Sequence, residues 1–145
     1  MSIAKRSINI GPPRFKIAIH SIVWLAKSDC ILSSAMIASQ VDSHATFMRR
    51  VMQSLAVAGI VESRAGREGG YILRKPADQI TLGEIYSAVS TGEEEIEADV
   101  DCGKAGEQLD IELEKIFYEA EQQTIDYLRK YTILDVMNRI EFFES

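Results

Sequence analysis

Arginine, amide and hydroxyl side chains gather on one face of a helix predicted over residues 45–58. With successive residues turned by about 100° along the helix, this outer face carries Thr46, Arg49, Arg50 and Gln53. The opposite face is apolar and holds Met48, Val51, Met52, Leu55 and Ala58. Guanidinium, amide and hydroxyl groups bond both phosphates and base edges. The helix therefore suits nucleic-acid binding, and the alternative is an ordinary amphipathic helix whose polar face is only solvated.

A glycine-rich hairpin is predicted directly after this helix. The pattern becomes extended over 60–64 and again over 71–74, and three glycines between them suit a tip that needs positive φ angles. Basic residues mark the hairpin at Arg64, Arg67, Arg74 and Lys75. The bare backbone at Gly69 and Gly70 can also approach a phosphate closely.

Charge divides the 145-residue chain into two unlike halves. Residues 1–80 hold eleven basic and five acidic residues, a net charge of +6, whereas residues 81–145 hold five basic and seventeen acidic ones, a net charge of −12. Phosphate affinity comes from local Lys and Arg, so the total of −6 does not exclude a polyanionic partner. The division indicates a nucleic-acid-binding half and a second half with another task.

Periodic apolar residues predict the remaining elements. Helices are expected over 14–29, 33–41, 81–91 and 106–131, with a last helix ending at about 143. Gly59 is a natural helix stop, and Thr81–Glu84 and Thr132–Asp135 match capping boxes. The order helix, short helix, polar turn, helix and hairpin is that of a winged helix-turn-helix. We therefore expect a mainly α fold with a small β-hairpin wing, divided into a DNA-binding domain over 1–80 and a helical region over 81–145.

Several classes of protein are excluded or disfavoured by what the sequence lacks. No run of eighteen apolar residues exists, and the N-terminus does not read as a secretory signal, so a cytoplasmic protein without a membrane partner is expected. Phosphate-loop, nucleophile-elbow and zinc-protease motifs are missing, and two isolated histidines supply little general-base capacity. We expect no enzyme and no metal site.

The hairpin and the helix after it resemble those of the Rrf-type transcription regulators, the family that includes IscR, NsrR and CymR. Residues 59–73 read GIVESRAGREGGYIL, beside a family wing pattern of G-L-V-x-S-x-R-G-x-x-G-G-Y-x-L. Residues 76–89 read PADQITLGEIYSAV, beside the pattern I-T-L-x-x-I/V-x-x-A-V. The order of the helices along nearly the whole chain agrees as well.

This resemblance implies a homodimeric regulator, a repressor or an activator, that binds double-stranded DNA in a sequence-specific manner. The sequence does not give the sign of regulation, and of the two we expect a repressor. DNA contacts are implied for His44, Thr46, Arg49, Arg50, Gln53, Arg64, Arg67, Gly69 and Gly70. A dimer interface in which the long helices cross is implied for Leu109, Leu113, Ile116, Phe117, Ala120 and Leu128.

The sequence departs from the family pattern in its cysteines. Many relatives hold a [2Fe–2S] cluster through three cysteines in the loop before the long helix, where this chain has only Cys102. We therefore expect no cluster and no other cofactor, and place the chain with the cluster-free branch. Cys102 is a candidate redox sensor, although a structural loop residue is the better interpretation. The other functional class that stays open is a winged-helix adaptor that binds protein and not DNA.

Overall fold

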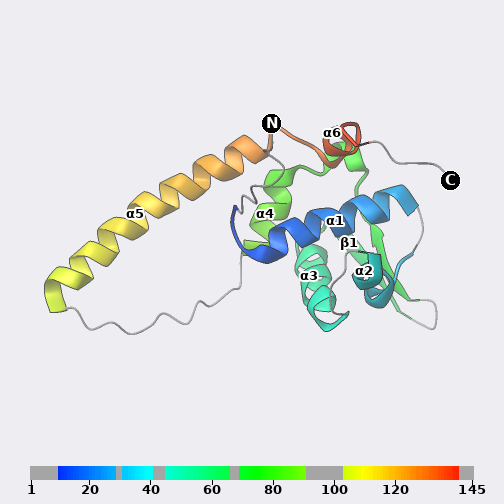
Figure 1. The fold of residues 1–145 in the computed structure, drawn as a ribbon, viewed down its shortest axis with the longest axis horizontal. Coiled ribbons are helices and arrows are strands. Elements are labelled where there is room, and N and C mark those ends of the chain that lie inside the picture. The colour runs from blue at the N-terminus through cyan, green and yellow to red at the C-terminus, as the bar shows by residue number, and fades with distance from the viewer. Residues whose placement is uncertain (1–9, 29–30, 41–44, 66–68, 91–102, 141–145) are drawn as a thin grey trace, which may run out of the picture.

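The computed structural model of the chain describes residues 10–28, 31–40, 45–65, 69–90 and 103–140. Its elements are α1 (Pro13–Ser28), α2 (Ser34–Gln40), α3 (Ala45–Val57), β1 (Val61–Arg64), β2 (Gly70–Leu73), the 3-10 turn η2 (Ala77–Gln79), α4 (Leu82–Ser90), α5 (Gly103–Leu128) and α6 (Ile133–Met137). The predicted class, mainly helical with one antiparallel hairpin, is confirmed. In Figure 1 the other elements cluster around α1, with the hairpin at the right of the body, while α5 extends away from them to the left.

Two predicted helix boundaries are wrong. The long helix spans Gly103–Leu128 and not 106–131, because the chain turns after Leu128 so that the Tyr131 carbonyl accepts a hydrogen bond from the Leu82 amide at 2.9 Å. The last helix ends at Met137 and not near 143, since residues 138–140 form turns. At the end of α5 the apolar periodicity continues beyond the point where this tertiary contact ends the helix.

The local capping signals are confirmed. Gly59 follows α3 with a φ of 80°, and the amides of Gly59 and Ile60 bond the carbonyls of Ala56 and Leu55, each at 3.0 Å. This is the Schellman arrangement of a helix end. The Glu84 amide bonds Thr81 Oγ1 at 3.1 Å and the Thr81 amide bonds Glu84 Oε2 at 3.2 Å, which closes the capping box of α4. Thr132 and Asp135 form the same box on α6.

One hydrophobic core joins the two halves of the chain. Its fully buried large side chains are Ile22, Ile37, Met48, Val51, Met52, Leu55, Ile60, Val61, Ile80, Ile85, Val89 and Ile133. They come from α1, α2, α3 and β1 as well as from α4 and α6. The core thus contains residues from both sides of position 80. The division into 1–80 and 81–145 therefore remains a prediction about the functions of the two halves.

A short backbone bridge fixes the hairpin to the helical body. The Tyr71 amide donates to the Leu32 carbonyl at 2.8 Å, and the Leu32 amide donates to the Tyr71 carbonyl at 3.1 Å. Gly70 allows this close approach, since a Cβ atom there would lie 2.4 Å from the Leu32 oxygen. The segment between α1 and α2 therefore sets where strand β2 lies.

Replacing Gly70 with alanine should destabilise the protein by about 1–3 kcal/mol, as overpacking against fixed backbone does. The neighbouring backbone cannot yield easily because the Leu32–Tyr71 bonds hold both segments. Thermal or urea unfolding measures the change, with Ser63→Ala as the control because Ser63 is an exposed residue on the facing strand. Equal stability of the two variants would mean that the hairpin is not held against Leu32.

Candidate nucleic-acid interface

Helix α3 presents one buried and one exposed face, as predicted. Met48, Met52 and Leu55 are completely buried, which fixes the rotation of the helix about its own axis. Opposite them, the exposed residues are Thr46, Arg49, Arg50 and Gln53. Ala58 was expected on the buried face but is exposed, because the helix ends at Val57 and the chain turns at Gly59.

The two arginines of α3 are available to an external partner. Among the described residues no ion pair involves Arg49 or Arg50, although acidic side chains lie on other elements. Figure 1 shows α3 on the side of the body away from α6. Two adjacent guanidinium groups on an exposed helix face can bond two phosphates or one phosphate and one base edge.

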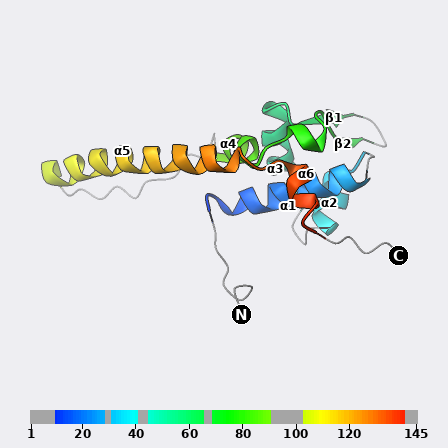
Figure 2. The same cartoon turned by 90° about the horizontal axis from the view of Figure 1, so that it is seen from above.

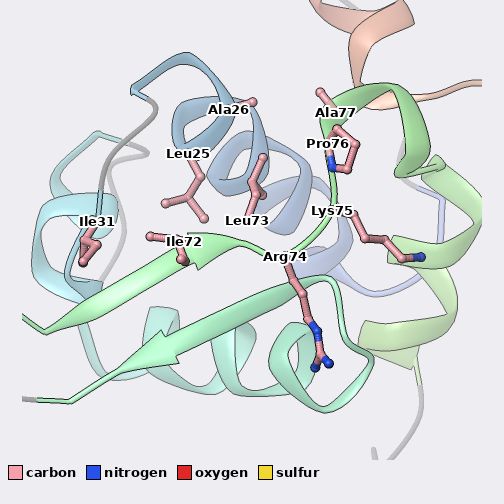
Figure 3. A pocket seen from close by; sticks show the side chains of 9 residues that line it. All are labelled: Leu25, Ala26, Ile31, Ile72, Leu73, Arg74, Lys75, Pro76 and Ala77. Carbon is pink, nitrogen blue, oxygen red and sulfur yellow. The ribbon is translucent and has the colours of Figure 1, made fainter.

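The hairpin is less basic than its sequence predicts. Arg64 NH2 lies 2.8 Å from Glu62 Oε2, so an acidic neighbour on the same strand partly neutralises its charge. Lys75 forms an ion pair with Glu84 of the α4 capping box, and Figure 3 shows its side chain directed toward α4. Sequence reasoning placed Lys75 with the basic wing, whereas the structure uses it to attach the base of the hairpin to α4. Arg74 remains exposed.

The Arg64–Glu62 pair could have been found in the sequence. Residues two apart on a strand point to the same side, so Glu62 and Arg64 must lie close together. The pair Lys75–Glu84 joins different elements and leaves no such local signal.

Replacing Glu62 with glutamine should strengthen DNA binding several-fold at low salt. The change removes a carboxylate beside Arg64 and leaves one more uncompensated positive charge on the hairpin. The gain should shrink as salt rises, because the added attraction is electrostatic. Fluorescence anisotropy with labelled duplex DNA at several salt concentrations measures it, and Glu112→Gln on α5 is the matched control. If the Glu62 and Glu112 variants bound duplex DNA with equal affinity, Arg64 would not belong to the DNA interface.

Some predicted site residues lie outside the described part of the chain. These are His44, Arg67 and Cys102. Gly69 and Gly70 are described and half-buried, and neither has the positive φ expected of the hairpin glycines. Gly70 instead allows the close contact with Leu32 described above. A phosphate contact at Gly69 or Gly70 stays a prediction.

Within the described residues, the contacts of the long helix α5 with α4 lie toward its C-terminal end. Ile125 is its one buried residue among those described, and Gly83 of α4 packs so closely there that a Cβ would lie 2.8 Å from the Ile125 carbonyl oxygen. Tyr86 donates a hydrogen bond to Glu121 at 3.3 Å, and burial together with the Glu121 charge raises the pKa of that hydroxyl. Figures 1 and 2 both show the N-terminal part of α5 extending beyond the body.

The residues predicted for a dimer interface lie largely exposed on α5. Leu109, Ile116 and Phe117 are 59%, 60% and 62% exposed, Ala120 is exposed, and Leu113 and Leu128 are half-buried. A contiguous exposed apolar stripe of this kind indicates an interaction surface.

Within the described residues, no group of three or more histidine, cysteine or acidic side chains is placed to hold a metal ion. None of the helices described is both long and apolar enough to cross a membrane.

A known protein family matches this chain over most of its length. The family model Rrf2, described as "Iron-dependent Transcriptional regulator", matches residues 13–139, which include every element from α1 to α6. The chain belongs to the Rrf2 family of transcriptional regulators. The resemblance drawn from the hairpin pattern is therefore confirmed, and Rrf2 regulators are a family of transcription factors.

Individual relatives agree with this Rrf2 assignment. YwnA of Bacillus subtilis (strain 168), which is named as an HTH-type transcriptional regulator, is 32% identical over 130 residues, covering 88% of this chain and 96% of YwnA. The structure of T. potens IscR matches with a TM-score of 0.66 at 16% identity, over 96% of this chain and 95% of IscR. CymR, the global cysteine regulator of B. subtilis, matches with a TM-score of 0.64 at 19% identity, over 93% and 100%. The two structures establish the winged-helix fold.

Proposed function

We propose that this Rrf2-family protein binds duplex DNA in a sequence-specific manner as a homodimer and represses transcription by occupying its site. The observation that carries the proposal is the exposed face of α3, where Arg49 and Arg50 stand opposite a completely buried apolar face. A helix held in this way can enter a major groove while its inner face stays in the core. Arg64 and Arg74 on or beside the hairpin would contact the flanking phosphates.

Dimerisation is supported by the exposed stripe of α5. In a dimer the stripe would pack against its counterpart on a second copy and remove Leu109, Ile116 and Phe117 from water. Two-fold symmetry would then place two α3 helices on one side of the DNA, in major grooves about 34 Å apart or at a larger spacing on the same DNA face.

Selection of bound sequences from random duplex DNA tests the function directly. The full-length protein should enrich an inverted repeat, because a two-fold dimer reads two equivalent half-sites. The distance between the half-sites reports the separation of the α3 helices. Recovery of no motif, together with weak binding that is lost as the salt concentration rises, would instead favour the winged-helix protein adaptor.

The donor groups of the chain do not fit an iron–sulfur cluster. Relatives that hold such a cluster group three cysteines in the loop before the long helix, whereas this chain has only Cys102 there and one other cysteine, Cys30, elsewhere. The two cysteines and the two histidines of the chain lie far apart in sequence, and His20 is exposed on α1. We propose that the protein works without a cluster, although the family is described as iron-dependent.

Protein purified from iron-replete cells without oxygen should therefore be colourless. Visible absorption and iron and sulfide analysis measure this, and an iron-loaded cluster protein purified in parallel is the control. Charge-transfer bands with stoichiometric iron and sulfide would contradict the cluster-free assignment.

Cys102 remains a candidate redox sensor. Its thiol would form a sulfenic acid or a mixed disulfide under oxidative stress. The test compares the DNA affinity of the wild type with that of Cys102→Ser, each with and without peroxide. A sensor role predicts that peroxide changes the affinity of the wild type alone. Equal responses would leave regulation to a small molecule or a partner protein.

A further inference from the structure

Helix α5 carries a second line of apolar side chains, apart from the stripe proposed for dimerisation. Ile111, Tyr118 and Ile125 recur every seven residues, so they lie along one side of the helix. Leu109, a member of the stripe, points to nearly the opposite side, because two residues turn a helix by about 200°. Ile125 is buried where α5 packs on α4, whereas Ile111 and Tyr118 are 52% and 64% exposed. The N-terminal part of the line is therefore accessible.

A row of carboxylates accompanies this line. Glu107, Glu114 and Glu121 each lie four residues before one of its members, which makes them neighbours on the helix surface. Within the described residues, no ion pair involves any of the three. A hollow of about 640 Å³ at Glu114 and Glu121 is lined by residues of α5 alone. We call Ile111, Tyr118 and these three glutamates the acidic face of α5, and it fits a short segment that is both basic and apolar.

The first described residues lie at the Glu121 end of the acidic face. A Cβ atom at Gly11 would come within 3.2 Å of the Tyr86 hydroxyl oxygen, and that hydroxyl donates a hydrogen bond to Glu121 at 3.3 Å. The Phe15 ring packs edge-on against the Tyr86 ring with centroids 5.1 Å apart, which holds the start of α1 at this place. The chain that precedes Gly11 is therefore attached beside Glu121.

Residues 1–9, which lie outside the described part of the chain, combine basic and apolar side chains. They read Met-Ser-Ile-Ala-Lys-Arg-Ser-Ile-Asn and include no acidic residue. Lys5 and Arg6 complement the charge of the glutamates, and Ile3 and Ile8 suit the exposed apolar side chains. Burying an isoleucine contributes more free energy than an exposed ion pair does. The isoleucines would therefore supply most of the stabilisation, and the cations would select this face of the helix.

The reach of this segment matches the acidic face. An extended segment running from Gly11 would bring Ile8 about 10 Å and Arg6 about 17 Å along α5. At about 1.5 Å per helical residue, these levels lie about seven and eleven residues before Glu121. Ile8 would thus lie between the two exposed apolar residues of the acidic face, and Arg6 between its first two glutamates.

We propose that residues 1–9 of the same chain lie along the acidic face of α5. Ile8 packs between its two exposed apolar residues, and the cations Lys5 and Arg6 pair with its first two glutamates. The segment would then connect the start of α1 to the N-terminal half of α5, on the side away from the dimerisation stripe. Its two cations would be occupied there and would not contribute to DNA binding.

Disulfide formation between introduced cysteines tests this placement. In the Cys30→Ser/Cys102→Ser background, Ile8→Cys/Ile111→Cys is compared with its matched control Ile8→Cys/Glu112→Cys. A disulfide requires Cα atoms within about 7 Å, and position 112 points about 100° away from position 111 around the helix. The pair with position 111 should therefore close at least about tenfold faster than the control pair. A non-reducing gel distinguishes disulfides within one chain from those between chains, and circular dichroism shows that each variant is folded.

Charge reversal tests the proposed ion pairs. Lys5→Glu/Arg6→Glu should slow closure of the pair with position 111 by about fivefold or more, because repulsion replaces two surface ion pairs. Adding Glu107→Lys/Glu114→Lys should restore the rate. Adding Glu112→Lys/Glu119→Lys, the same change of charge on another side of α5, should not.

Three results would overturn the proposal. The first is equal closure of the pairs with positions 111 and 112, or closure of neither. The second is a disulfide that forms only between chains, which would assign the acidic face to the segment of a second copy. The third is a closure rate that charge reversal leaves unchanged, which would contradict the pairing with the glutamates.

Discussion

Replacing Ile116 with aspartate should leave the chain folded and convert the proposed dimer into a monomer. Ile116 is 60% exposed in the single chain, so the substitution removes little packing within it. In a dimer that pairs the α5 stripes, the change would bury two carboxylates, each at a cost of several kcal/mol. The dissociation constant should therefore rise by about a thousandfold or more, since each 1.4 kcal/mol is a factor of ten.

Sedimentation at micromolar concentration measures this change. Lys115→Asp is the matched control, because it introduces the same side chain one residue away and outside the apolar stripe. Circular dichroism shows whether both variants are folded. A folded Ile116→Asp protein that is still dimeric at micromolar concentration would place the interface elsewhere.

Replacing Arg49 and Arg50 together with alanine should nearly abolish binding to the selected DNA site. Both side chains are exposed, and alanine favours helix, so α3 should persist. Each contact of an arginine with a base edge is worth about 1–3 kcal/mol, so the loss should reach about thirtyfold or more. An arginine that reads a base would relax specificity at one position, whereas one that contacts a phosphate would lower the salt slope by about one.

Fluorescence anisotropy with the selected duplex and with single-base variants distinguishes these roles. Lys104→Ala serves as the control, because it removes a positive charge from the far end of α5, away from α3. Wild-type affinity of the double variant at every salt concentration would exclude α3 as the DNA-reading helix. That result would favour the adaptor function, because the fold would then present the same face to a protein.

The features that the sequence predicted well are those coded by neighbouring residues. The stop at Gly59 and the capping boxes at Thr81 and Thr132 depend on residues two to five positions apart, and all three appear as expected. The burial of Met48, Met52 and Leu55 follows from one helical period. The exposed face of α3, and with it the centre of the candidate site, could therefore be derived before the fold was known.

Contacts between distant segments could not be derived in this way. The bridge from Leu32 to Tyr71 joins positions on either side of α2 and α3, and no local pattern announces it. Lys75 appeared basic and free in sequence, although the fold brings Glu84 against it. The end of α5 at Leu128 likewise depends on the hydrogen bond between Leu82 and Tyr131. Tertiary pairing decided each of these points, and single-residue propensity is weak against it.

Helix α5 is packed against the rest of the described chain near Ile125. A small tilt of the helix at this point therefore moves its N-terminal end by a larger distance. From Ile125 to Gly103 the helix is about 33 Å long at about 1.5 Å per residue, so a tilt of about 10° moves its far end by about 6 Å. That displacement exceeds the rise of one base pair, about 3.4 Å. In the proposed dimer, the packing near Ile125 would therefore determine which distance between two DNA half-sites the protein can bind. Because Gly83 lies against the Ile125 carbonyl, the absence of a side chain at one position of α4 would determine the separation of the two DNA-reading helices.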